Sequence, residues 1–226
     1  MNFASKTEAG IKGFNQDALV IPAKENDSKT YGHCFAVSDG ITLCPKGGDL
    51  AQYSMKIVAL YYQHALKEGA GEKALDLALD QLWNDFFEKA ERENDDDSLV
   101  SGATLTIALV LNGKLHIRHM GDSTCDLFLP DGSALRLTDE HSTPDGCLVN
   151  YFGGEMKTPP QADTFDFPQG SKLLLSSDGI SYFLDAEAMQ KIGERLDWNG
   201  DDMIKEMFAI SAQAGSTDDC TILFGY

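Results

Sequence analysis

The sequence SKLLLSSDGISYFL, residues 171–184, holds a short apolar run that ends abruptly in Ser-Asp-Gly. The sequence HCFAVSDG, residues 33–40, has the same form. Short apolar runs bounded by turn residues are typical of buried strands, and Asp-Gly is typical of turns. We therefore predict two buried strands, each followed by an aspartate, Asp178 and Asp39.

The segments around these strands alternate between strand and helix patterns. Apolar residues recur at helical spacing over 49–68, 72–92 and 186–213, which predicts amphipathic helices. Further strand patterns lie at 18–22, 103–111, 114–120, 125–130, 134–138 and 221–226. We predict that the four runs within 103–138, joined by short turns, form an antiparallel meander. This arrangement indicates the α+β class, in which helices cover antiparallel sheets.

Composition excludes several classes of protein. The 226 residues are 42% hydrophobic and 24% charged, enough for one sizeable core, and we expect a single domain over 1–226. With 36 Asp and Glu against 18 Lys and Arg, the net charge of −18 disfavours nucleic acid and membrane surfaces as partners. Five cysteines without a Cys-x-x-Cys pair, and no apolar leader, predict a cytoplasmic protein without a disulfide framework.

Several reaction mechanisms are also excluded. No cysteine is followed six positions later by Arg, so the cysteine-dependent phosphatase motif is absent. A nucleophile elbow, a His-Glu-x-x-His zinc motif and a P-loop are absent too. His116 and His119 lie three apart in a strand pattern and should point to opposite faces. We interpret both histidines as structural or surface residues.

Aspartates recur where predicted strands begin or end. They are Asp17, Asp39, Asp122, Asp178 and Asp218. A single Asp-Gly pair is ordinary turn chemistry. If several converge, each carboxylate pair about 4 Å apart costs on the order of 1–4 kcal/mol, so the cluster requires cations. Oxygen ligands without Cys or His favour Mg²⁺ or Mn²⁺.

The order and spacing of these motifs resemble the metal-dependent protein phosphatases of the PPM, or PP2C, type. Eight matches follow the family's order: Lys12-Gly-Phe-Asn-Gln-Asp17, FAVSDG at 35–40, Ser101-Gly-Ala-Thr104, Gly121-Asp-Ser123, LTDEHS at 137–142, FGG at 152–154, LLLSSDGISYFL at 173–184 and Asp218-Asp-Cys-Thr221. Together they argue against chance agreement. The resemblance implies a four-layer αββα sandwich, with two antiparallel sheets flanked by helix pairs and a metal site at one edge.

The resemblance also implies a role for each aspartate. Asp17 and Asp39 would bind a pair of ions together with the carbonyl group of Gly40. Asp178 and Asp218 would complete the coordination of one ion. These four aspartates would be the catalytic residues because they would hold the two inner ions, Mn²⁺ or Mg²⁺. In this mechanism the ions activate a shared water, which attacks phosphorus.

The implied function is a metal-dependent protein serine/threonine phosphatase. Asp122 would bind an outer third ion. Lys12 stands where the family usually has a phosphate-binding Arg, and would hold the substrate phosphate as a point charge. The substrate would be a phosphoprotein, opposed by a Ser/Thr kinase, and the acidic chain would favour basic residues around the phosphosite.

The chain departs from the family pattern at several other positions. Gln16 replaces Glu, Asp219 replaces the usual Asn, and residues 41–43 replace a Gly-rich stretch. Few residues separate His141, which we interpret as structural, from the FGG motif, so the family's flap is short and the site should be open. These changes leave an alternative: a catalytically weak regulatory or phosphoprotein-binding module. Hydrolysis of a small phosphate ester is a third possibility.

Overall fold

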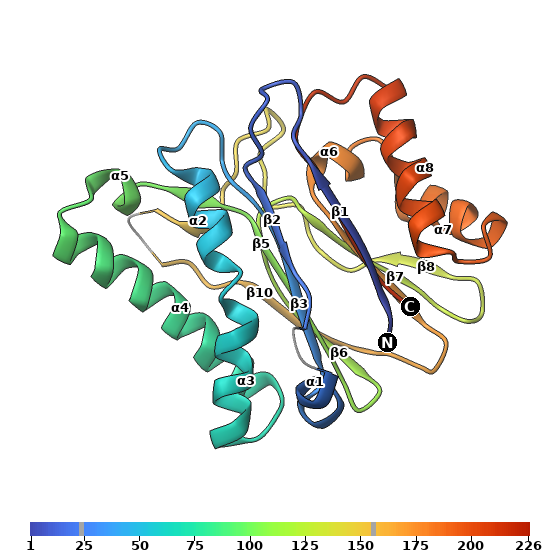
Figure 1. Cartoon of the computed structure of the whole chain (residues 1–226), viewed down its shortest axis with the longest axis horizontal. Coiled ribbons are helices and arrows are strands. Elements are labelled where there is room, and N and C mark those ends of the chain that lie inside the picture. The colour runs from blue at the N-terminus through green and yellow to red at the C-terminus, as the bar shows by residue number, and fades with distance from the viewer. Residues whose placement is uncertain (23–24, 155–156) are drawn as a thin grey trace.

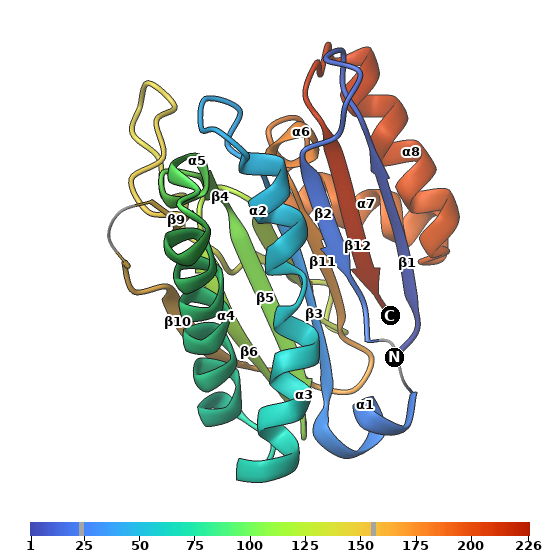
Figure 2. The ribbon, with the colours of Figure 1, turned by 60° about the vertical axis from the view of Figure 1, so that its left-hand side comes forward.

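Two five-stranded sheets pack face to face in the computed structural model, and helices cover both outer faces (Figures 1 and 2). The structure describes residues 1–22, 25–154 and 157–226. One sheet has the order β1-β12-β11-β7-β8 and the other β10-β6-β5-β3-β2, and every neighbouring pair is antiparallel. This is the four-layer sandwich that the sequence predicts.

The elements follow one another in a mixed order. The strands of the two large sheets are β1 (Phe3–Glu8), β2 (Asp17–Val20), β3 (His33–Asp39), β5 (Leu105–Leu111), β6 (Lys114–Met120), β7 (Thr124–Phe128), β8 (Ala134–Arg136), β10 (Gln161–Asp166), β11 (Lys172–Ser176) and β12 (Cys220–Gly225). A small separate sheet pairs β4 (Gly102–Ala103) with β9 (Phe152–Gly153). The helices are α1 (Glu25–Tyr31), α2 (Gly47–Ser54), α3 (Ile57–Glu68), α4 (Glu72–Glu93), α5 (Asp96–Leu99), α6 (Asp178–Ser181), α7 (Ala186–Arg195) and α8 (Gly200–Gln213). Among these described helices, none is both long and apolar enough to cross a membrane.

The central strands are buried on both faces. In β11, Leu173 and Leu175 point into the core between the two sheets, whereas Leu174 points toward the α7 and α8 side. In β12, Leu223 and Phe224 divide in the same way. Strands covered on both faces need no polar positions, which explains the continuous apolar runs in the sequence.

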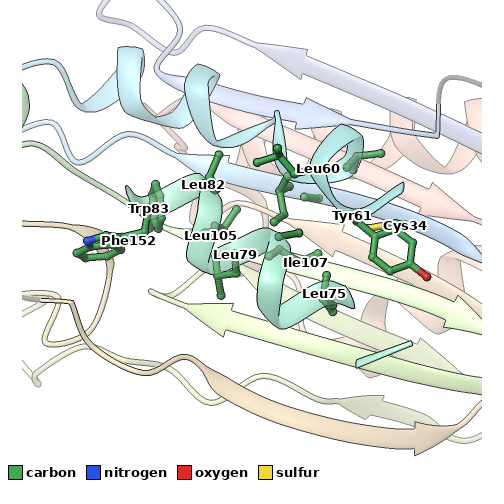
Figure 3. Close-up of a cluster of buried hydrophobic side chains, with 14 of the residues drawn as sticks. Cys34, Leu60, Tyr61, Leu75, Leu79, Leu82, Trp83, Leu105, Ile107 and Phe152 are labelled. Atoms are coloured by element: carbon green, nitrogen blue, oxygen red, sulfur yellow. The ribbon is translucent and has the colours of Figure 1, made fainter. Parts of the chain in front are cut away.

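The opposite face of the sandwich is closed by α3 and α4 (Figure 3). Leu75 and Leu82 on α4 pack in one cluster with Leu105 and Ile107 of β5. Trp83 meets Phe152 edge-on, with ring centroids 5.3 Å apart. This aromatic contact joins α4 to β9, near the end of the molecule where the aspartates lie.

The prediction that residues 103–138 form a single antiparallel meander is wrong. Strands β5 and β6 form a hairpin in one sheet, but β7 and β8 form a hairpin in the other. The segment Gly121–Ser123 carries the chain from one sheet to the other. Short turns determine which strands are neighbours within each hairpin, but burial between layers decided the sheet of each hairpin.

Two further differences concern helix and strand limits. The helix predicted over 49–68 is divided into α2 and α3, and the Ser54 hydroxyl donates to the Ala51 carbonyl where α2 ends. Strands β1 and β10 were not predicted. Both are edge strands with many exposed side chains, so they lack a long apolar run.

Candidate metal centre

The strand-terminal aspartates meet at one end of the sandwich. Asp17 begins β2 and Asp39 ends β3, and the two residues are direct partners in the antiparallel pair. In the other sheet β11 and β12 are also antiparallel neighbours, so Asp178, after β11, and Asp218, before β12, lie at a common edge. The loops around α2 and α6 at this end lie toward the top of Figures 1 and 2, opposite α1 and the termini.

A pocket of about 370 Å³ opens at this end. Its lining includes Asp39, Gly40, Asp122, Asp178 and Asp218. Residues predicted from four separate stretches of the sequence therefore border one space. Its volume falls in the range of small-molecule sites.

Asp17 lies behind this pocket, beside Asp39, and is only 2% exposed. Its Oδ2 accepts a hydrogen bond of 2.7 Å from the hydroxyl of Ser177, which links the two sheets. Within the described part of the chain, Oδ1 of Asp17 and Oδ1 of Asp178 are buried without a hydrogen-bond partner. Buried carboxylate oxygens without partners are costly, and a bound cation would satisfy them.

The electrostatics of the cluster point the same way. Burial, and then the charges of Asp17 and Asp178, raise the pKa of Asp39 well above its usual value. Burial raises the pKa of Asp17 and the pKa of Asp122 to about 6 each. Burial and the charge of Asp218 raise the pKa of Asp178. The carboxylates thus oppose one another's ionisation, a conflict that divalent cations would remove.

The donor set suits a hard cation, since it consists of carboxylate and carbonyl oxygens. Among the described residues, no three His, Cys, Asp or Glu side chains are already grouped closely enough to hold one ion. The assignment of individual ligands therefore stays a prediction. The convergence of the aspartates on the pocket is what the structure adds to it.

Close packing requires glycine at the second position of two Asp-Gly pairs, Asp39-Gly40 and Asp178-Gly179. A Cβ atom on Gly40 would lie 2.4 Å from the backbone nitrogen of Gly48, at the start of α2. A Cβ atom on Gly179 would lie 2.1 Å from the carbonyl oxygen of Asp219. Each glycine therefore lets a neighbouring segment approach the aspartate that precedes it.

Two hydroxyl residues that sequence reasoning did not assign to the site support the aspartates. Thr104 Oγ1 accepts from the backbone N–H of Asp39 at 2.8 Å and lies 2.8 Å from Ser123 Oγ. Ser177 holds Asp17, and its only sequence signal is its position directly before Asp178.

Asp219 has a structural role in this end of the molecule. Its carboxylate is buried and accepts from the backbone N–H groups of Gly10 and Gln16, at 2.8 and 2.7 Å. It is not among the residues that line the pocket. Asp219 therefore anchors the loop that carries Lys12.

We expect Asp219→Ala to lower the free energy of unfolding by about 2–4 kcal/mol, because two backbone N–H groups lose their acceptor. Asp219→Asn, which keeps one acceptor oxygen, should lose about half as much. Urea unfolding of the metal-free protein measures both values. Equal stability of Asp219→Ala and the wild type would show that the carboxylate does not anchor this loop.

Lys12 lies at the rim of the pocket. Its Nζ donates to Thr42 Oγ1 at 2.7 Å and pairs with Asp218 Oδ1 at 3.2 Å. The Thr42 hydroxyl in turn donates to Gln16 Oε1 at 3.2 Å. The predicted phosphate cation is thus next to a predicted metal ligand. Because the pair is partly exposed, it holds Lys12 only weakly.

The histidines have structural contacts, as predicted. His119 is buried, bonds Thr106 Oγ1 through Nδ1, and stacks on His141 with ring centroids 4.9 Å apart. His141 Nδ1 accepts from the backbone N–H of Gly121 at 3.3 Å. His116 faces the other side of the sheet and contacts Thr164. His141 therefore supports the crossing segment beside Asp122, and it is not among the pocket-lining residues.

Comparison with known proteins identifies the family to which this chain belongs. The sequence model of the protein phosphatase 2C family matches residues 9–218. Among solved structures, the serine/threonine phosphatase PstP/Ppp of Mycobacterium tuberculosis has a TM-score of 0.78 at 18% identity, over 99% of this chain and 97% of that one. The serine/threonine phosphatase of S. agalactiae has a TM-score of 0.79 at 16% identity, over 99% and 98% of the two chains.

A third structure, the catalytic domain of the serine/threonine protein phosphatase PstP in complex with two manganese ions, has a TM-score of 0.77 at 19% identity, over 99% of this chain and 96% of that one. At these identities the similarity shows the fold. No match to the chain was found among curated proteins. Because the family match spans most of the sequence, the chain belongs to the protein phosphatase 2C family, whose members are metal-dependent protein serine/threonine phosphatases. The resemblance stated from the motifs is confirmed.

Proposed function

We propose that this chain hydrolyses phosphoserine and phosphothreonine in proteins with two inner divalent ions, Mn²⁺ or Mg²⁺. The observation that carries the proposal is the convergence of four strand-terminal aspartates at one end of the sandwich, where Asp39, Asp178 and Asp218 line one pocket and Asp17 lies behind it. Two of the four have a buried oxygen without a hydrogen-bond partner among the described residues. A related phosphatase structure holds two manganese ions, which supports the choice of cation.

The proposed ligands of the inner ions are Asp17, Asp39, the Gly40 carbonyl, Asp178 and Asp218, with Asp122 serving a third ion. Bound ions would supply an activated water and positive charge for the phosphoryl oxygens. The supporting residues prepare the ligands. Ser177 occupies Oδ2 of Asp17 and leaves Oδ1 available, and Thr104 fixes the backbone of Asp39.

Lys12 would bind the substrate phosphate from the rim. Its present partners are the Thr42 hydroxyl and Asp218. Once Asp218 serves as a metal ligand, the ammonium group is free to donate to a phosphoryl oxygen. A lysine delivers the charge there but cannot make the paired hydrogen bonds of a guanidinium group.

We expect Lys12→Ala to raise KM for a phosphopeptide, and Lys12→Arg to lower it by up to about tenfold if one further charge-assisted bond forms. Both variants should bind Mn²⁺ nearly as the wild type does. Steady-state kinetics on a phosphothreonine peptide and a calorimetric Mn²⁺ titration measure the two effects. Wild-type kinetics for Lys12→Ala would show that Lys12 does not hold phosphate.

The proposed activity is tested by assaying p-nitrophenyl phosphate and a phosphothreonine peptide, each with Mn²⁺ and with EDTA. Turnover of the peptide that requires Mn²⁺ is the expected result. Turnover of p-nitrophenyl phosphate alone would instead indicate a small-ester hydrolase. Peptide binding without turnover of either substrate would indicate the regulatory module.

The same proposal includes the cellular setting. The catalytic unit would be one domain over residues 1–226, acting in the cytoplasm on the product of an opposing Ser/Thr kinase. All five cysteines, which lie in the described ranges, are free thiols, and a reducing compartment would keep them so.

A further inference from the structure

One wall of the pocket is apolar, although its floor is acidic. We call this the apolar wall and define it as Ile41, Leu43, Leu148 and Tyr151. It comes from two loops, one after Asp39-Gly40 and the other within the short segment before the FGG motif. These are the loops where the sequence departs from its family, through residues 41–43 and the shortened flap.

Glycines let the two loops meet. A Cβ atom on Gly102 would lie 2.8 Å from Ile41 Cδ1 and 3.0 Å from the ring of Tyr151, so both side chains rest over Gly102. The backbone N–H of Ile41 donates to the Gly102 carbonyl at 3.0 Å. Close packing on Gly154 also supports Tyr151, since a Cβ there would lie 3.1 Å from its hydroxyl oxygen. The base of the wall is therefore held by β4 and the residues after β9.

Leu43 stands at the open edge of this wall and is 95% exposed. It directly follows Thr42, the hydrogen-bond partner of Lys12. Exposed apolar side chains gathered around a concave site mark a binding surface more often than isolated ones do.

We propose that the apolar wall binds an apolar side chain next to the phosphorylated residue of the substrate, and that Leu43 determines this specificity. The inference rests on the phosphatase activity proposed above. Consecutive Cα atoms of a peptide lie about 3.8 Å apart, so when the phosphate reaches the floor, the side chain of a neighbouring residue is within reach of the wall. Because the apolar wall and the acidic floor line the same pocket, the occupant of the wall is the part of the substrate next to its phosphate.

This specificity differs from the preference that net charge alone predicts. The charge of −18 favours basic neighbours at long range. At contact distance, however, the four side chains of the wall offer apolar atoms except for the Tyr151 hydroxyl, and burying a lysine ammonium against them is unfavourable. An acidic neighbour is opposed at long range by the same net negative charge. Leu, Ile or Met next to the phosphosite fits both constraints.

The test uses three phosphothreonine peptides that differ only in the residues on both sides of the phosphothreonine: Leu, Ala or Lys. With Mn²⁺, kcat/KM for the Leu peptide should exceed that for the Ala peptide by about fivefold, mainly through KM, because part of a leucine side chain leaves water. Leu43→Ala should remove most of this preference, mainly by raising KM for the Leu peptide. Leu66→Ala, at a 64% exposed position on α3, is the matched control and should keep it.

A binding measurement separates this inference from the proposed activity. Fluorescence anisotropy with non-hydrolysable phosphonate versions of the peptides gives Kd directly, and the Leu peptide should again bind about fivefold more tightly in wild type only. A preference for Lys, or a Leu preference unchanged by Leu43→Ala, would overturn the inference. A dimer that depends on Leu43 in size-exclusion chromatography would overturn it too, by assigning the wall to a second copy. Peptide selectivity in binding without any turnover would contradict only the proposed activity.

Discussion

Asp39→Asn and Asp178→Asn are each expected to lower kcat by about a hundredfold or more, because each removes a charged oxygen ligand from the proposed two-ion centre. The fold should persist, since asparagine keeps the volume of aspartate. In the metal-free state Asp39→Asn should be at least as stable as the wild type. Its carboxylate is opposed by burial and by Asp17 and Asp178, and the neutral amide relieves that conflict.

Steady-state kinetics with saturating Mn²⁺, together with thermal melting in EDTA, measure both effects. Asp131→Asn is the control: Asp131 also precedes a glycine, but its carboxylate contacts Ser133 in an exposed turn that does not line the pocket. This variant should keep wild-type turnover. If both site variants retained more than about a tenth of the wild-type kcat, the two-ion mechanism would be rejected.

Mn²⁺ is expected to raise the melting temperature at pH 7.5 by about 5–10 °C when present at a hundred times its Kd, which corresponds to about 2.7 kcal/mol. The shift should be much smaller at pH 5, because protons compete with the ion for the carboxylates. Asp17 and Asp122 have pKa values of about 6, above the ordinary 3.8. A raised carboxyl pKa gives stability that is present at low pH and is lost as the pH rises through about 6.

Differential scanning fluorimetry at both pH values, with EDTA or Mn²⁺, tests this expectation. In EDTA the contribution of these two carboxyl groups falls between about pH 4 and pH 6, and the ion restores the loss at pH 7.5. Asp39→Asn should show a smaller dependence on both pH and Mn²⁺. An unchanged melting temperature up to millimolar Mn²⁺ would contradict the metal centre.

Much of the fold could be predicted because the informative patterns are local. The buried strands β3, β11 and β12 appear as apolar runs, and α4 begins and ends close to where the periodicity predicts. Edge strands β1 and β10 were missed because half-exposed strands carry little apolar signal. The division of the predicted meander between two sheets could not be seen, since residues 121–123 specify a turn and not its direction.

The candidate site, like the fold, could be predicted only in part from the sequence. Asp17, Asp39, Asp178 and Asp218 could be proposed as site residues because each stands at a strand end, and their order matches the family. Ser177, Thr104 and the anchoring contacts of Asp219 were not assigned, because their partners lie 160, 65 and 209 residues away along the chain. Hydrogen bonds at such separations leave no local pattern.

The sequence by itself determined the class of this protein: which segments are the buried strands, which aspartates stand at their ends, and that oxygen ligands without cysteine or histidine favour a hard cation. Only the tertiary structure decided how those groups are used. Packing two sheets face to face brought Asp17 and Asp178 to one end, paired Lys12 with Asp218, and joined two loops over Gly102 into an apolar wall. The physical reason is that charge repulsion, burial and close packing act through space, between residues whose separation in the sequence carries no information about their distance.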